Sequence, residues 1–175
     1  MIEARVAKIV MVVSLALFAG IVTIDNLIYY DANFEFVRHV LSMDTVFPGN
    51  TLVYRRVTSP ALWNLAYCLI ILGEGVTSLT LGIGAIALTR QLRSEGARFN
   101  RGKRSVLIGA TMGFLVWFLG FMVVGGEWFQ MWQSQAWNGQ EGAFRFYLTL
   151  LAVLIFVSQE DGDLPPHGHD RSWPR

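Results

Sequence analysis

The chain has 175 residues, of which 53% are hydrophobic and 15% are charged, whereas a typical soluble domain carries about 25% charged residues. We therefore expect a single integral membrane domain. The net charge of +1 gives no strong positive field, so nucleic-acid binding is not expected. Because Cys68 is the only cysteine, the sequence excludes an intrachain disulfide and a thiolate metal cluster.

The first predicted span covers residues 6–24. Residues 9–24 carry no charge, and the whole span, at about 28 Å, is long enough to cross a bilayer core. A cleaved signal peptide is the alternative, because Arg5 and Lys8 precede the apolar run. The segment 17–19 (Leu-Phe-Ala) fits a small-residue cleavage site poorly, so we favour a retained span.

A polar loop, residues 25–59, follows the first span. Residues 34–41 are predicted to form a short helix, and the segment 47–50 (Phe-Pro-Gly-Asn) predicts a turn. Pro60 suits the first turn of a second span, residues 61–88. The small residues of this span, which allow another helix to approach closely, are Gly73, Gly75, Ser78 and Gly82.

Residues 90–104 contain six basic residues and one acid, so the positive-inside rule predicts that this loop is cytoplasmic. The 22 uncharged residues 105–126 form the third predicted span. Residues 146–159 are uncharged over only 14 positions, so a fourth span, 143–159, has to include Arg145. A re-entrant or surface helix is the alternative for this segment. We expect residues 160–175 to be a disordered cytoplasmic tail. His167 and His169 are spaced to hold a metal only loosely, and a solvated tail is the favoured interpretation.

The segment 125–141, which follows the third span, contains three of the six tryptophans and no basic residue. Tryptophan is enriched where hydrocarbon meets headgroups, because its ring is apolar and its N–H needs a partner. We therefore predict an interfacial cap on the outer face. Its residues are Trp128, Trp132, Trp137 and Asn138.

The predicted topology brings separated polar residues to this outer level. The candidate functional or structural sites there are Asp25, Arg38, His39, Asp44, Glu127 and Arg145. We expect a lid of salt bridges, with Glu127 and Arg145 as one pair; a ligand or proton site is the alternative. Asp31, Glu35 and His39 are spaced to share one helix face, where a divalent ion could bind. The same spacing fits ordinary helix charge pairs, and no metal site is predicted.

Glu74 is the only charge in the second span. It lies 14 residues beyond Pro60, or about 21 Å along a helix, and therefore inside the hydrocarbon core. Such a carboxylate is protonated, paired or facing a cavity. One interpretation is a packing hydrogen bond; the other is a protonatable or ligand-binding residue. The candidate partners for the bond are Asn64, Thr77, Ser78 and Thr111.

The sequence lacks the common motifs of catalytic and cofactor-binding sites. No histidine lies in a predicted span, so two histidines of this chain cannot hold a haem within the membrane. The sequence also lacks a nucleophile elbow, a phosphate loop, a zinc-protease motif and a Cys-x-x-Cys pair. We predict no catalytic residue and no cofactor, and self-contained catalysis is not expected.

Several strings resemble a known family over residues 5 to 158. They are Asp25-Asn26, Asn33-Phe34, residues 36–45 (FVRHVLSMDT), the span with Glu74, residues 126–134 (GEWFQMWQS) and residues 137–140 (WNGQ). Together they are similar to domain-of-unknown-function family 2165, predicted small integral membrane proteins. The resemblance implies a bacterial inner-membrane protein of four helices with no assigned activity.

The expected fold is thus an all-α, four-helix transmembrane bundle with an outer-face loop and a Trp-rich cap. The favoured function is a non-catalytic accessory or assembly subunit that packs against partner membrane proteins or against itself in the lipid bilayer. A small oligomeric transporter or channel using Glu74 is the alternative, and a quinone- or lipid-linked enzyme component is the third. The expected location is the bacterial inner membrane, with both termini cytoplasmic.

Overall fold

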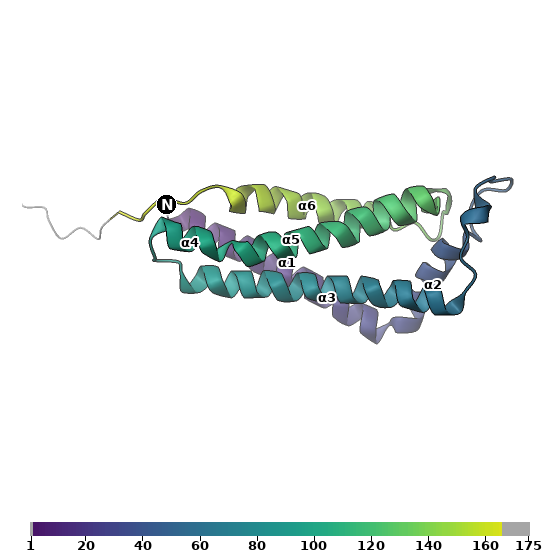
Figure 1. Cartoon of the computed structure of the whole chain (residues 1–175), viewed down its shortest axis with the longest axis horizontal. Coiled ribbons are helices and arrows are strands. Elements are labelled where there is room, and N and C mark those ends of the chain that lie inside the picture. Colours follow the sequence, from purple (N-terminus) through teal and green to yellow (C-terminus); the bar gives the residue numbers. More distant parts are fainter. Residues whose placement is uncertain (1, 166–175) are drawn as a thin grey trace, which may run out of the picture.

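The computed structural model describes residues 2–165, and every regular element in that range is helical. Four helical stretches are long and apolar enough to cross a membrane, which confirms the predicted four-helix fold. They lie side by side in an elongated bundle (Figure 1). Their bounds are α1 (Ile2–Ile28), α3 (Pro60–Arg90), α4 (Gly96–Gly102) continuing through α5 (Arg104–Phe114) and η2 (Leu115–Trp128), and α6 (Gln140–Ser158).

One end of the bundle, which we call the cap end, carries the short elements. They are α2 (Tyr30–Ser42), η1 (Val53–Arg55) and η3 (Met131–Gln133), and the loop around η1 projects beyond the long helices (Figure 1). The predicted short helix lies within α2. The predicted turn also forms, since the Asn50 N–H donates to the Phe47 carbonyl over 3.2 Å and Gly49 adopts a φ of 82°.

The opposite end, which we call the basic end, holds α4, the start of α1 and residues 159–165. The sequence predicts a disordered tail from residue 160, but in the structure Asp161 is buried against Lys8 and Lys103. The ordered chain therefore continues past the fourth span. Residues 166–175, with both histidines of the predicted tail, lie outside the described residues.

Small residues bring the long helices close together. A Cβ added at Gly109 of α5 would lie 2.9 Å from the backbone nitrogen of Leu81 on α3, and one at Gly84 would lie 2.9 Å from the Val106 nitrogen. Gly82, predicted to belong to this interface, has no atom within 4 Å of such a Cβ. Gly84, two positions further along α3, occupies the interface instead.

Candidate functional site

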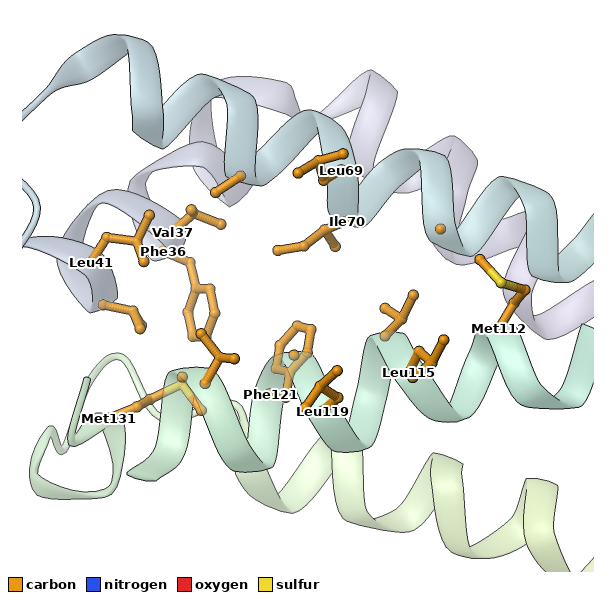
Figure 2. A pocket seen from close by; sticks show the side chains of 17 residues that line it. Phe36, Val37, Leu41, Leu69, Ile70, Met112, Leu115, Leu119, Phe121 and Met131 are labelled. Atoms are coloured by element: carbon orange, nitrogen blue, oxygen red, sulfur yellow. The ribbon is translucent and has the colours of Figure 1, made fainter. Parts of the chain in front are cut away.

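A lateral apolar groove lies between α3 and η2 at the cap-end half of the bundle. It has a volume of about 450 Å³, and residues of α2 together with Met131 line its cap-side end. Side chains from all three helices point into it (Figure 2). They include Phe36 and Val37 of α2, Leu69 and Ile70 of α3, and Leu115 and Leu119 of η2.

The winding of η2 shapes this groove. The helix continues α5 as a π-helix, in which each N–H reaches five residues back, as the Phe129 N–H does to the Val124 carbonyl over 3.0 Å. The η2 residues that line the groove accordingly recur about once per turn, at 115–116, 119–121 and 124–125. π-Helices are rare and frequently occur at functional sites, which marks the groove as the candidate site.

The groove is open along its length. Leu69, Leu115, Leu119 and Val124 line it and are each exposed by more than a third. At its inner end, Gly73 of α3 meets the Val116 side chain of η2, and a Cβ on Gly73 would lie 2.5 Å from Val116 Cγ2. In a membrane, this opening faces the lipid hydrocarbon.

Glu74, next to Gly73, is turned away from the groove and towards α1. Its side chain is only 2% exposed, and Asn26 Nδ2 donates to its Oε2 over 2.7 Å. The Tyr67 hydroxyl in turn donates to the Asn26 carbonyl over 2.8 Å. This chain of hydrogen bonds joins α1 to α3.

The predicted partners of Glu74 were wrong. Their polar side chains instead donate to main-chain carbonyls, in three cases four residues earlier on the same helix. These bonds are Asn64 to Pro60, Thr77 to Gly73, Thr111 to Leu107 and, across to α1, Ser78 to Ala16. Sequence reasoning missed Asn26 because it placed residue 26 in the loop after the first span, whereas α1 continues to Ile28.

Three of the predicted outer polar residues meet in a cluster on α2 and the loop after it. Arg38 Nε donates to Glu35 over 2.7 Å, and Arg38 Nη2 donates to His39 Nε2 over 2.8 Å. Since Nε2 accepts, the Nδ1–H of His39 donates to Asp44 over 2.9 Å. The His39 ring stacks on Trp137 with centroids 4.4 Å apart. We call Glu35, Arg38, His39 and Asp44 the His39 cluster.

The hydrogen bond to Glu35 raises the pKa of the Arg38 guanidinium above its ordinary value, so this group stays charged. Within residues 2–165, no three metal-binding side chains gather at one place. Glu35 instead forms an i,i+3 charge pair with Arg38, and its Oε2 lies 3.7 Å from Nε2 of His39 at i,i+4.

The predicted pair of Glu127 and Arg145 does not form. Arg145 pairs with Glu141, one turn earlier on α6, and both side chains are exposed. A neighbour at i,i+4 on the same helix is within reach without any tertiary contact, which explains the preference. Glu127 is exposed, and its carbonyl accepts a hydrogen bond from Gln130. Asp25 is also exposed, with no polar side-chain partner in the described part of the chain.

The Trp-rich cap is fastened to the first loop. Gln133 Oε1 accepts hydrogen bonds from the Phe47 N–H and from Asn50 Nδ2, over 2.9 and 3.0 Å. Trp132 contacts Phe47 edge-on, with centroids 5.8 Å apart. Asn138 Oδ1 accepts from the Gln140 N–H at the start of α6. The cap therefore holds the loop and the fourth helix in one layer, with Trp132 half-exposed.

Sequence reasoning missed the buried charges at the basic end. Lys8 and Lys103 both donate to Asp161 Oδ2, over 2.6 and 2.5 Å, and all three side chains are less than 10% exposed. Burial alone would raise the pKa of the Asp161 carboxyl, but the hydrogen bonds and charges of Lys103 and Lys8 lower it below 3.8. The sequence offered one signal for this cluster, because Asp161 lies only two residues after the end of the predicted fourth span, close to the level of the basic residues.

Arg5, also at the basic end, is 1% exposed and has carbonyl partners. Its guanidinium donates to the Leu92, Ser94 and Gly162 carbonyls over 2.7 to 2.9 Å. Sequence reasoning used Arg5 and Lys8 only as flanking charges of a span. In the structure they hold the residues after α6 against the start of α1.

Comparison with known proteins supports this architecture. Residues 4–160 match the family described as predicted small integral membrane protein, domain of unknown function 2165. Neither the curated proteins nor the solved structures include a significant match. The matched range contains the four long helices, apart from the first two residues of α1, and also the His39 cluster and the Trp-rich cap. The chain therefore belongs to domain-of-unknown-function family 2165 and is a small integral membrane protein that resides in a lipid bilayer.

Proposed function

We propose that the protein is a non-catalytic accessory or assembly subunit that binds a partner membrane protein through its cap end. The observation that carries the proposal is a set of exposed aromatic side chains at the cap end, which we call the aromatic patch: Phe47 and Trp132 contact each other edge-on, and Tyr54 lies on η1. Tyr54 is 76% exposed and Trp132 46%. Exposed apolar patches mark interaction sites, and tyrosine and tryptophan are enriched among the residues that dominate binding energy.

The patch is held in place before any partner binds. The two hydrogen bonds to Gln133 fix the Phe47 loop, and Thr45 donates to the Ser134 hydroxyl over 2.9 Å. A surface that is already ordered loses less conformational entropy on association. This order supports a docking role for the cap.

The interior supports this function better than transport. Glu74, the residue on which a transport pathway would depend, is engaged by Asn26, and the groove beside it is lined by apolar side chains. A pathway for ions or polar solutes needs polar groups along its length. The same features give no chemical group for catalysis in the groove.

For the location, we propose the bacterial inner membrane with the basic end in the cytoplasm. Five arginines lie in residues 90–104, at the basic end, and cytoplasmic loops carry such an excess. The cap end is then on the outer side. Both described ends of the chain, residues 2 and 165, lie at the basic end (Figure 1).

The test is a purification of the tagged protein in a mild detergent, with quantitative mass spectrometry of what copurifies. We expect a stoichiometric membrane partner with the native protein and its loss with Tyr54→Ala combined with Trp132→Ala. Phe144→Ala is the matched control, because Phe144 is 44% exposed on α6. A partner that is retained by the double variant, or the absence of a stoichiometric partner, would contradict the proposal.

A further inference from the structure

Arg55, at the cap end, has a charge that the described residues do not neutralise. Its guanidinium stacks on the Trp128 ring at 4.4 Å, and Nη1 donates to the Trp128 carbonyl over 3.3 Å. Its Nε is buried without a hydrogen-bond acceptor, and no carboxylate within residues 2–165 pairs with it. The next residue, Arg56, is exposed and also lacks an acidic partner in that range.

Arg55 contacts η2 at Trp128, beyond the groove-lining residues of that helix. The η2 residues that line the groove are 115–116, 119–121 and 124–125, and Trp128 lies four residues beyond the lining residue Val124, about one turn of this π-helix further towards the cap. Trp128 is 53% exposed and is the side chain on which Arg55 stacks. The apolar groove thus leads, along one face of η2, to an unpaired guanidinium.

The dimensions fit one leaflet of a bilayer. On α3 the lining runs from Ala66 to Gly73, about 10 Å of helix, and Ala66 lies about 9 Å from Pro60 at the cap end of α3. One leaflet supplies about 15 Å of hydrocarbon, half of a core of about 30 Å. The groove therefore begins near the interface, where headgroups lie, and closes at Gly73 inside the hydrocarbon.

We propose that this groove is a binding site for an anionic phospholipid of the surrounding bilayer. One acyl chain occupies the groove between α3 and η2, and the phosphate lies against Arg55, with Arg56 contributing charge. Hydrogen bonds from a guanidinium to phosphate are strong and geometrically specific, and each basic residue near the surface attracts anionic lipid by about 1 kcal/mol.

Charge and shape favour this occupant over two others. The ring of an isoprenoid quinone is neutral and would leave the Arg55 charge unpaired. A partner helix, at about 10 Å or more in diameter, fits a groove of about 450 Å³ less well than a single acyl chain does. Trp128 adds an interfacial side chain of the kind that lies at headgroup level.

The test uses the full-length protein in detergent, titrated with phosphatidylglycerol or with phosphatidylcholine of the same acyl chains, and counts bound lipids by native mass spectrometry. We expect preferential binding of phosphatidylglycerol and a loss of this preference by about fivefold in Arg55→Gln. Arg145→Gln is the matched control, because it removes the same charge at the same end of the bundle. We expect it to leave the preference unchanged.

The groove itself is tested by Gly120→Leu. A Cβ at Gly120 has only the Leu115 carbonyl oxygen within 4 Å, at 3.7 Å, so the new side chain can extend into the groove and exclude the acyl chain. Gly142→Leu on α6 is the control, since a Cβ there meets no atom within 4 Å. If Gly120→Leu does not fold, Leu119→Trp narrows the same groove from a half-exposed position.

Equal binding of the two lipids, or binding unaffected by both Arg55→Gln and the groove variant, would overturn the proposal. A bound quinone, or a partner helix that only the groove variant displaces, would overturn it as well. The lipid site is independent of the aromatic patch, so loss of a partner protein in the Tyr54 and Trp132 variant does not decide it.

Discussion

The two ends of the bundle use charge in opposite ways. At the cap end, the side chains of Glu35, Arg38 and Asp44 in the His39 cluster are each more than 30% exposed, and Arg55 has no acidic partner among the described residues. At the basic end, Lys8, Lys103 and Asp161 are buried together. The cap end thus leaves its charged groups accessible, whereas the basic end buries its charges between α1, α4 and the residues after α6.

The largest effect of a single substitution is expected from Asp161→Asn. It leaves two lysine side chains buried without a counter-charge, and breaking a buried ion pair costs about 3–5 kcal/mol. We expect a large fall in the unfolding temperature in detergent. Glu141→Gln, which removes the exposed partner of Arg145, is the control and is expected to change the temperature little. Equal, small effects of both variants would show that the basic-end charges do not stabilise the fold.

The same carboxyl predicts a dependence on pH. Because the pKa of Asp161 is lower in the folded protein than its ordinary value of 3.8, its stabilising contribution is present above pH 3.8 and is lost as the pH falls through the lowered pKa. Lowering the pH from 6 to about 3 should therefore destabilise the native protein more than it destabilises the Asp161→Asn variant. Thermal unfolding of both proteins at each pH measures this difference. Parallel curves for the two proteins would contradict the assignment.

An intermediate effect is expected at Glu74. Glu74→Gln can still accept the hydrogen bond from Asn26, so we expect little change in stability. Glu74→Leu leaves the Asn26 amide unpaired in the interior, at a cost of about 1–3 kcal/mol. Thermal unfolding of both variants compares them. If Gln destabilises the protein as much as Leu does, the charge of Glu74 has a role beyond the hydrogen bond to Asn26.

The smallest effect is expected in the His39 cluster. His39→Ala removes the bond to Asp44 and the stacking on Trp137, but the charged neighbours are solvated, so the expected loss is about 1 kcal/mol. Thermal unfolding again measures it. A loss comparable to that of Asp161→Asn would erase the distinction between the two ends.

Sequence patterns predicted the long helices, but they did not predict which residues of different helices contact one another. Three apolar runs of spanning length and a shorter fourth run predicted the bundle, and Pro60 and Gly49 marked a helix start and a turn. The burial of Glu74 followed from its depth, but its partner depended on the rotation of α1, which length and composition do not determine. Asp161 and Lys8 are 153 positions apart, so no local pattern connects them.

The groove was also beyond the reach of sequence reasoning. Residues 105–126 read as one uncharged span, and nothing in that pattern shows that α5 changes to the π-helical winding of η2 at Leu115. The groove depends on that change and on the separation of η2 from α3 beyond Gly73. Arg55 appeared only as one of several loop charges, since its position beside Trp128 is set by tertiary packing.

The central claim is that the cap end binds a protein partner, and site-specific photocrosslinking in cells tests it most directly. A photoreactive amino acid is placed at position 54, on the projecting loop, and in a second variant at position 79, where Leu79 is 64% exposed on the lipid-facing side of α3. We predict a crosslinked product of one defined protein mass from position 54 and none from position 79. No protein crosslink from position 54, or the same product from both positions, would contradict the claim.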